Sequence, residues 1–378
     1  MAMVAGEASG DLLAGLLLGG LKERWPQLSA YGIGGPRMAE HGFHAWWPHD
    51  KLAVRGYVEV LSHYREIAGI RSQLADRLLH AEPAARADAF IGVDAPDFNL
   101  GVESRLKAAG VKTIHFVSPS IWAWRGGRIE GIGRATNLVL CIFPFEPEIY
   151  ARRNINAVYV GHPLASAIPF EVPRAAGRAA LGIGADETLV ALLPGSRRSE
   201  IGYIAPRLFG AAAEMSRTRP GLRFVVPVVP GLRDAVEALR RQYAPDAAIT
   251  LLDGQAHEAL AACDVTIVAS GTATLEAALF KRPMVVVYVM HFLSWQMGKL
   301  MHYQPWISLP NILLREHAVP ELLQGGATPA KIAAAAFKWL DDPGAAESLR
   351  VRFEEIHRAL KRDTGALATA AIESVLAA

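Results

Sequence analysis

Short apolar runs that alternate with amphipathic stretches are the feature that most restricts what this chain can fold into. Each run has the length of a strand and leads into a turn or a helix-like segment. This alternation predicts parallel strands joined by crossover helices. The runs are Ala2–Ala5, Leu28–Ile33, Phe90–Val93, Lys112–Val117 and Leu138–Ile142, then Leu189–Leu193, Arg223–Val229, Ala248–Leu252, Val265–Ala269 and Met284–Val289.

The chain has 378 residues, which is too long for one ordinary hydrophobic core, and both halves show the same rhythm. We therefore expect an α/β protein with two Rossmann-like domains, residues 1–165 and 166–345, that face each other across a cleft. Proline and small residues between Pro163 and Pro173 mark the boundary. Residues 346–378 are strongly helical by composition.

Charge and cysteine content exclude several classes of protein. The formal net charge of +2 does not indicate a nucleic-acid partner. Cys141 and Cys263 lie far apart in apolar runs, which favours buried free thiols in a reducing compartment over a disulfide framework. Because no apolar run has the length of a membrane span and no signal peptide precedes the first strand, we expect a cytoplasmic protein.

The stretch "FIGVDAPDFNLG" places two carboxylates where a buried strand hands over to a helix. Ligands of such sheets bind at the carboxyl ends of the strands, and Asp94 is the first residue after one. Pro96 has no N–H and disfavours helical geometry at Ala95, so the backbone is expected to stay extended and direct Asp94 into the cleft. Asp97 and Asn99 follow a turn later, where they either cap the helix or orient Asp94 or a ligand.

Three other strand-end loops are suited to bind phosphate groups, because small residues at a helix start leave backbone N–H groups open to anions. They are "GEASGD", "LLPGSRRSE" and "ASGTATLE". Each has a plainer interpretation: a helix cap at Ser9 or Asp11, a surface arginine pair at Arg197, and a capping box at Glu276. The first loop lacks the G-x-G-x-x-G spacing, which disfavours an NAD oxidoreductase.

Seven motifs in a fixed order carry a resemblance to a known family. "VAGEASGD", "GGPRM", "VEVL", "VDAPDFN", "HFVSPSIWAW", "LLPGSRRSEI" and "SLPN" resemble the lipid-A-disaccharide synthases, which are glycosyltransferases with the two-domain GT-B architecture. The resemblance covers the chain from about residue 2 to its C-terminus. It implies a bacterial enzyme of lipid A (lipopolysaccharide) biosynthesis that uses no cofactor and no metal.

The resemblance also implies the substrates and the reaction. The family condenses UDP-2,3-diacylglucosamine with 2,3-diacylglucosamine 1-phosphate, inverts the donor anomeric carbon, and releases UDP and a β-1,6-linked disaccharide 1-phosphate. An inverting transfer needs a base for the acceptor hydroxyl, and Asp94 matches the family's proposed base. The sequence also has no Asp-x-Asp motif after a strand, in keeping with a metal-independent reaction.

The binding residues implied by the resemblance fall into two groups. The donor (UDP) group is Ser196, Arg197, Gly254, Ser270, Gly271, Thr272, Thr274, Glu276 and Asn311. The acceptor group is Glu7, Ser9, Asp97, Asn99, His115, Trp122 and Arg125. For His115 and Trp122, ordinary core packing remains an open alternative.

Acylated substrates imply a peripheral association with the inner face of the cytoplasmic membrane. Arg55–Leu79, an amphipathic stretch with basic flanks, and Met290–Trp306, rich in aromatic residues, are candidate contact segments. Core packing explains both patterns equally well. The C-terminal helices are expected to pack back on the first domain or to be exchanged in a homodimer.

Two other functions remain open at this point. One is a UDP-N-acetylglucosamine 2-epimerase, which has the same two-domain fold and would act on UDP-sugar without an acceptor. The other is a non-catalytic nucleotide-sugar binding protein, in which Asp94 and Arg197 are only a helix cap and a surface charge.

Overall fold

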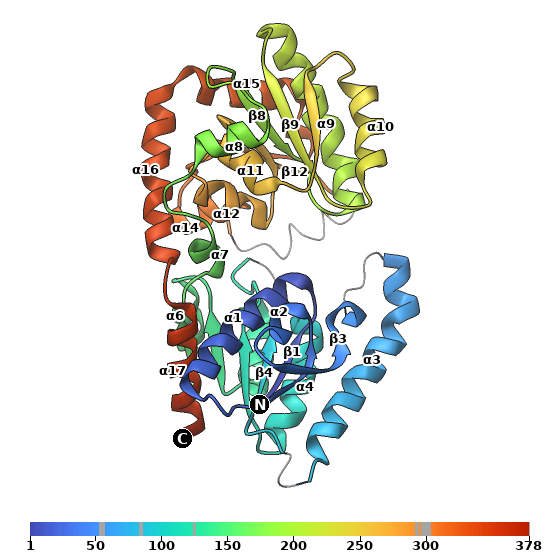
Figure 1. The fold of residues 1–378 in the computed structure, drawn as a ribbon, viewed down its shortest axis with the longest axis vertical. Coiled ribbons are helices and arrows are strands. Elements are labelled where there is room, and N and C mark those ends of the chain that lie inside the picture. The colour runs from blue at the N-terminus through green and yellow to red at the C-terminus, as the bar shows by residue number, and fades with distance from the viewer. Residues whose placement is uncertain (53–56, 83–85, 124–125, 292–294, 296–303, 378) are drawn as a thin grey trace. The chain divides into compact units, whose positions relative to one another are not determined.

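The computed structural model describes residues 1–52, 57–82, 86–123, 126–291, 295 and 304–377 (Figure 1). The chain divides into two compact units, one of residues 1–166 and 360–378 and one of residues 167–359. It passes from the first unit to the second after Ser166 and returns after Ala359. Each unit is built on a parallel sheet, so the prediction of two Rossmann-like α/β domains is confirmed.

The first unit contains a seven-stranded parallel sheet with the order β3-β2-β1-β4-β5-β6-β7. The strand order reverses between β1 and β4. The strands are β1 (Ala2–Ala5), β2 (Ala30–Gly34), β3 (Phe43–Pro48), β4 (Ala89–Val93), β5 (Lys112–Phe116), β6 (Leu138–Cys141) and β7 (Ala157–Tyr159).

Helices cover both faces of this sheet, which is why its central strands are continuously apolar. The helices are α1 (Ala8–Arg24), α2 (Pro36–Ala39), α3 (Tyr57–Leu79), α4 (Pro96–Ala108), α5 (Ile129–Ala135), α6 (Glu146–Ala151), α7 (Pro163–Ala167) and α17 (Thr364–Ala377), with 3₁₀ turns at His49–Leu52 and Gly126–Arg128. On one face Val4 and Phe90 pack with Leu74 of α3 and Val102 of α4. On the other, α17 lies beside α1 (Figure 1).

The second unit contains a six-stranded parallel sheet with the order β10-β9-β8-β11-β12-β13, which reverses between β8 and β11. The two sheets thus share one topology over their first six positions. The strands are β8 (Leu189–Leu193), β9 (Arg223–Val228), β10 (Ile249–Asp253), β11 (Val265–Ala269), β12 (Met284–Tyr288) and β13 (Glu321–Leu323).

The helices of the second unit also cover both faces. They are α8 (Arg174–Ala180), α9 (Arg198–Thr218), α10 (Arg233–Tyr243), α11 (Ala256–Ala262), α12 (Thr272–Leu279), α14 (Leu309–Leu314), α15 (Pro329–Asp341) and α16 (Pro343–Leu360), with a 3₁₀ turn at Gln324–Gly326. Val190 and Ile267 pack with Phe209 of α9 and Ile332 of α15. Ala191 is also fully buried, because α11 and α12 cover the other face.

The C-terminal segment differs from the sequence-based expectation. Residues 346–378 do not pack on the first unit as one piece, because nearly all of α16 belongs to the second unit. Only α17 lies in the first, against α1 of its own chain. The contact is close, since a Cβ atom on Gly20 would lie 3.0 Å from the backbone of Gly365.

We expect Gly32→Ala to lower the free energy of unfolding by about 3 kcal/mol or more. Gly32 has φ +138°, and a Cβ atom there would lie 2.2 Å from the carbonyl oxygen of Met3 in the neighbouring strand. Gly69→Ala is the control, because a Cβ atom at Gly69 meets nothing within 4 Å and should stabilise α3 by about 0.5 kcal/mol or more. Urea unfolding of both variants tests this, and equal stabilities would contradict it.

Candidate active site

The carboxyl ends of β1 and β4 bring two predicted loops together in the first unit. Ala5 pairs with Val93, so the residues that follow each strand are neighbours. A Cβ atom on Gly6 would lie 3.4 Å from that of Ala95. Glu7 and Asp94 are both exposed here, as is Ser9 in the first turn of α1. Three predicted site residues therefore lie at the point where the strand order reverses, the usual ligand position in such sheets.

The backbone at Asp94 and Ala95 is left-handed, so the expectation of an extended conformation is wrong. The φ angles are +52° and +42°, which strain a non-glycine residue. The proline at position 96 disfavours the right-handed helical region for Ala95, and the left-handed region is the compact alternative. Three hydrogen bonds hold the turn: Asp94 N–H donates to Phe116 O at 2.8 Å, and the Asn99 side-chain amide donates to Asp94 O at 2.8 Å and Val93 O at 3.3 Å.

Asp97 and Asn99 have different surroundings. Asp97 lies in the first turn of α4, is exposed, and forms an ion pair with Arg128. Asn99 is fully buried and points back at the strand end, where it holds the Asp94 turn. The sequence left open whether Asn99 caps the helix, orients Asp94 or orients a ligand, and the structure places it against Asp94. The predicted direct contact of Asn99 with the acceptor does not fit a side chain with no exposed surface.

His115 does not fit the acceptor group either, because its side chain has no exposed surface. It lies on β5, and its Nδ1 is 2.8 Å from Oε1 of Glu103, a fully buried residue of α4. Burial raises the pKa of the Glu103 carboxyl, and the hydrogen bond with His115 acts in the opposite direction. The pair is internal to the unit and lies behind the strand that carries Asp94.

Trp122 is also buried, and its Nε1 donates to Oε1 of Glu146 at 3.0 Å. The other carboxylate oxygen of Glu146 accepts from Ile142 N–H at 3.1 Å and Phe143 N–H at 2.9 Å. Glu146 thereby ties the loop after β5 to the loop after β6. Burial raises the pKa of this carboxyl to about 7, while its hydrogen bonds lower it. Arg125 lies outside the described residues.

The motifs "GEASGD" and "GGPRM" are joined by Asp11. Its carboxylate accepts from the N–H groups of Gly35 at 2.8 Å, Arg37 at 2.9 Å and Met38 at 3.3 Å. Asp11 therefore caps α2. The sequence alone suggested that it would cap its own helix, α1. This contact fixes the start of α1, and with it the loop that carries Glu7 and Ser9.

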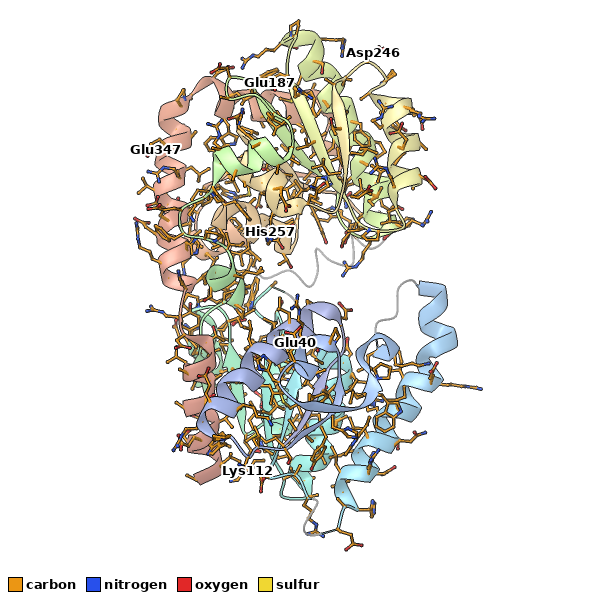
Figure 2. All side chains as sticks on the ribbon, in the orientation of Figure 1. Glu40, Lys112, Glu187, Asp246, His257 and Glu347 are labelled. Carbon is orange, nitrogen blue, oxygen red and sulfur yellow. The ribbon has the colours of Figure 1, made fainter. Side chains whose placement is uncertain are left out.

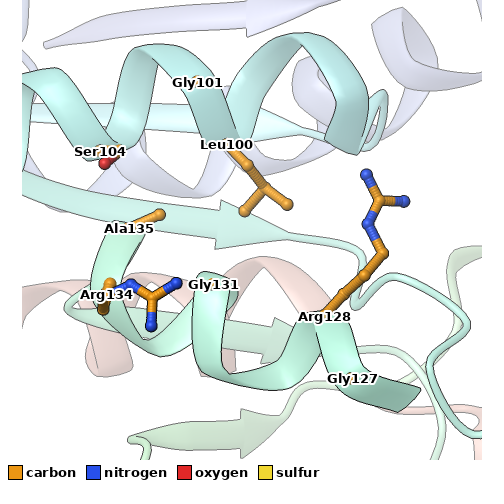
Figure 3. Close-up of a pocket in the computed structure, with 8 residues that line it drawn as sticks. All are labelled: Leu100, Gly101, Ser104, Gly127, Arg128, Gly131, Arg134 and Ala135. Carbon is orange, nitrogen blue, oxygen red and sulfur yellow. The ribbon is translucent and has the colours of Figure 1, made fainter. Parts of the chain in front are cut away.

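A groove of about 430 Å³ lies between α4 and α5 (Figure 3). Leu100 from α4 and Arg128 extend toward it (Figure 3). Its walls are Leu100, Gly101, Ser104, Gly127, Arg128, Gly131, Arg134 and Ala135. The groove combines small and apolar walls with two guanidinium groups, one of which, Arg128, forms the ion pair with Asp97.

In the second unit, β8 and β11 bring together the loops after Leu193 and Ala269. Ser196 and Arg197 are exposed in the first loop. Their backbone N–H groups donate to Oε2 of Glu200, at 3.1 Å and 3.2 Å. The sequence suggested that these N–H groups would be open to an anion, and in the structure they are already bonded. The Arg197 guanidinium lies 2.8 Å from Oε1 of Glu200 but remains mostly exposed.

The second loop starts α12. Gly271 has φ +152°, and nothing lies within 4 Å of the position of a Cβ atom there. Gly271 and Thr272 are exposed, whereas the buried hydroxyl of Thr274 donates to Gly271 O at 2.8 Å and so shapes the loop. The Ser270 hydroxyl donates to Ile307 O at 3.2 Å, which joins this loop to the "SLPN" segment.

Glu276 lies one turn into α12, facing the start of α11. Its Oε2 is 3.8 Å from Nε2 of His257, which is exposed and labelled in Figure 2. Burial raises the pKa of the Glu276 carboxyl, and the nearby His257 acts in the opposite direction. Gly254, with φ +69° and nothing within 4 Å of the position of a Cβ atom, lies in the turn that leads into α11. Both residues are therefore placed near the start of α11, Glu276 through His257 and Gly254 in the preceding turn.

Asn311 is fully buried, and both polar atoms of its side chain bind the protein. Its amide donates to Val319 O at 2.9 Å and to Glu321 Oε1 at 2.8 Å, while its Oδ1 accepts from Val319 N–H at 2.9 Å. Glu321 also accepts from the N–H and hydroxyl of Ser308. Asn311 thus holds the "SLPN" segment next to Ser270, and its predicted role as a donor contact does not fit this geometry.

Comparison with known proteins settles the family. A family model described as lipid-A-disaccharide synthetase matches residues 1–374. The chain belongs to this family. It is 55% identical over 381 residues to the lipid-A-disaccharide synthase of Albidiferax ferrireducens, with 100% of this chain and 97% of that relative covered. Because this relative is named a lipid-A-disaccharide synthase, which is a glycosyltransferase, the sequence-based prediction of enzyme class is confirmed.

Solved structures show the same fold at low sequence identity. A UDP-GlcNAc 2-epimerase from Neisseria meningitidis has a TM-score of 0.65 at 11% identity, with 100% of this chain and 99% of that one covered. MurG from Acinetobacter baumannii has a TM-score of 0.58 at 15% identity and covers 99% of both chains. These neighbours confirm the GT-B fold, and full-length identity favours the synthase family over the epimerase alternative.

Sequence reasoning missed four carboxylates that shape the loops: Glu103, Glu146, Glu200 and Glu321. Glu200 and Glu146 have a local signal, since each accepts from backbone N–H groups three and four residues before it. Glu103 and Glu321 bind residues more distant in the sequence. Within the described part of the chain, no cluster of three or more His, Cys, Asp or Glu side chains is arranged to hold a metal, and no helix is long and apolar enough to cross a bilayer.

Titration of Glu146 should make stability depend on pH. Burial raises the pKa of Glu146 in the folded state to about 7, so the folded state holds this proton more tightly than the unfolded state does. The contribution of Glu146 to the free energy of unfolding is therefore complete below the unfolded-state pKa and is lost as the pH rises through 7. Relative to Glu146→Gln, the wild-type free energy of unfolding should fall by about 2 to 3 kcal/mol between pH 5 and pH 8. Urea unfolding at both pH values measures this. The exposed Glu148→Gln is the control, and an equal difference at both pH values would contradict the assignment.

Proposed function

We propose that this chain transfers the diacylglucosamine group of UDP-2,3-diacylglucosamine to 2,3-diacylglucosamine 1-phosphate, giving the β-1,6-linked disaccharide 1-phosphate and UDP. Membership of the family supports the substrates. The observation that carries the proposal is Asp94, an exposed carboxylate on a strained turn where the strand order of the first sheet reverses. That is the position at which a catalytic group can meet a bound ligand.

Asp94 is the proposed general base. Its carboxylate accepts the proton of the acceptor 6-hydroxyl as that oxygen attacks the donor anomeric carbon from the face opposite UDP. The bond from the anomeric carbon to the diphosphate oxygen breaks with inversion, and UDP leaves. Glu7, Ser9 and Asp97 are the exposed residues near this turn that are proposed to contact the acceptor sugar.

The second unit is proposed to hold UDP. Arg197 offers an exposed guanidinium, and Gly271 and Thr272 offer backbone at the start of α12, all near the reversal point of the second sheet. These groups suit a diphosphate that gains negative charge as it leaves. Glu276 is proposed to bind the ribose hydroxyls, and Gly254 to line the uracil site, since nothing lies within 4 Å of the position of a Cβ atom on Gly254.

Because both proposed substrates carry acyl chains, we propose that the protein associates with the inner face of the cytoplasmic membrane. The proposed contact is peripheral, and its segment is not assigned. Arg55–Leu79 and Met290–Trp306 remain the sequence-based candidates, and both extend beyond the described residues.

Replacing Asp94 by Asn should abolish most catalysis without loss of the fold. Removal of a general base lowers kcat by about 10²- to 10⁴-fold. The measurement is the rate of disaccharide 1-phosphate formation from both acylated substrates in the presence of EDTA, followed by mass spectrometry. Asp88→Asn is the matched control, because Asp88 is an exposed carboxylate at the opposite end of β4, and its kcat is expected to equal that of wild type. A fully active Asp94→Asn would exclude Asp94 as the base, and turnover of UDP-sugar without acceptor would favour the epimerase.

Arg197→Ala should weaken donor binding, because it removes a charge-assisted contact to the diphosphate. We expect the Kd for UDP to rise about 10-fold or more, the effect of losing one such contact. The adjacent and equally exposed Arg198→Ala serves as control and should change Kd by less than about 3-fold. Isothermal titration calorimetry with UDP compares the two, and equal effects would show that only the general charge of the loop matters.

A further inference from the structure

Three buried polar side chains lie directly behind the Asp94 turn. Asn99 and Glu103 are one helical turn apart on α4 and so share a face of that helix. His115 lies on β5 and pairs in register with Gly92 of β4. All three side chains are fully buried. A hydrogen bond between Glu103 and His115 therefore joins α4 to β5 across the strand that carries Asp94.

Gly92 leaves the space that this arrangement occupies. A Cβ atom there would lie 2.2 Å from Oε1 of Glu103 and 2.8 Å from Cβ of Asn99. Any larger residue would push α4 away from β4 at the level of the turn. The absent side chain at Gly92 thus lets α4 approach closely enough for Asn99 to reach the carbonyl oxygens of Val93 and Asp94.

The network of Asn99, Glu103 and His115 lowers the stability of the fold in several respects, so stability alone does not explain it. Among the described residues, Asn99 Oδ1, Glu103 Oε2 and His115 Nε2 form no hydrogen bond with another protein atom. Buried polar atoms in this state each destabilise a fold by about 1 to 3 kcal/mol, and an apolar set of the same shape would avoid that cost. Two adjacent residues with positive φ add further strain. Such concentrations of unfavourable terms are characteristic of functional sites.

We propose that Asn99, Glu103 and His115 are positioning residues that hold the Asp94 carboxylate in the orientation needed to accept the acceptor proton. Asn99 acts on the turn itself through its two carbonyl contacts. Glu103 and His115 act through Asn99, because their hydrogen bond fixes the first turns of α4 against β4 and β5. This inference rests on the proposed function, in which Asp94 is the base.

The test compares kcat, KM for both substrates, UDP affinity and thermal midpoint for a set of variants, assayed well below the lowest midpoint. Asn99→Asp replaces the donating amide with a carboxyl facing two carbonyl oxygens. Glu103→Ala removes the bond to His115, and Glu103→Gln keeps an acceptor for it. Thr113→Val is the matched control, because it removes another buried hydrogen bond of β5, to Ala135 O. Asp94→Asn is included in the same series.

The expected result is a fall in kcat of about 10- to 100-fold for Asn99→Asp and Glu103→Ala, the effect of a misplaced catalytic group. KM and UDP affinity should stay within about 2-fold, since no substrate contact is lost. Glu103→Gln should restore most of kcat. Thr113→Val should lower the thermal midpoint and leave kcat unchanged.

Two results would overturn the inference. One is full kcat in Asn99→Asp and Glu103→Ala with a lowered midpoint, which is the behaviour of a structural network. The other is an equal loss in Glu103→Gln and Glu103→Ala, which would show that the charge is needed. If Glu103→Ala does not fold, Asn99→Ser and Glu103→Gln decide in its place. Full activity of Asp94→Asn would refute the proposed base itself, whereas an inactive Asp94→Asn beside fully active network variants would refute only the positioning role.

Discussion

Parallel strand pairing at two places, β1 with β4 and β8 with β11, is the constraint on which the rest of the structure depends. Because parallel strands end at the same edge, each pair brings loops that are distant in the sequence to one point. In the first unit the loops carry Glu7 and Asp94, and in the second they carry Arg197 and Gly271. The same topology therefore places the proposed base in one unit and the groups proposed to bind the diphosphate in the other.

Carboxylates, buried in the first unit and partly exposed in the second, then give these loops their shape. Asp11 fixes the loop after β1, Glu103 supports the turn after β4, and Glu146 joins the loops after β5 and β6. In the second unit Glu200 organises the loop after β8, and Glu321 holds the segment beside Ser270. Each carboxylate binds groups that would otherwise be unpaired, so the exposed residues next to them have defined positions before any ligand arrives.

The sequence predicted the two α/β units and the strands that end at the candidate sites, because apolar periodicity and small-residue loops are local signals. It did not predict that Asn311 is a buried support, and for His115 and Asn99 it left the buried role as one of several alternatives, since a motif records which residue is present and not which way its side chain points. The left-handed turn at Ala95 escaped prediction for a similar reason. Pro96 disfavours the right-handed helical conformation of Ala95. The left-handed conformation is then stabilised by the hydrogen bonds from Asn99 and to Phe116, which depend on the tertiary structure.

The most direct test of the central claim is a crystal structure of the protein with acceptor and UDP bound. We expect an Asp94 carboxylate oxygen at hydrogen-bond distance, about 2.6 to 3.2 Å, from the acceptor 6-hydroxyl, with the turn still left-handed and still held by Asn99. A structure in which another side chain, such as that of Glu7, occupies this position while Asp94 points away would contradict it.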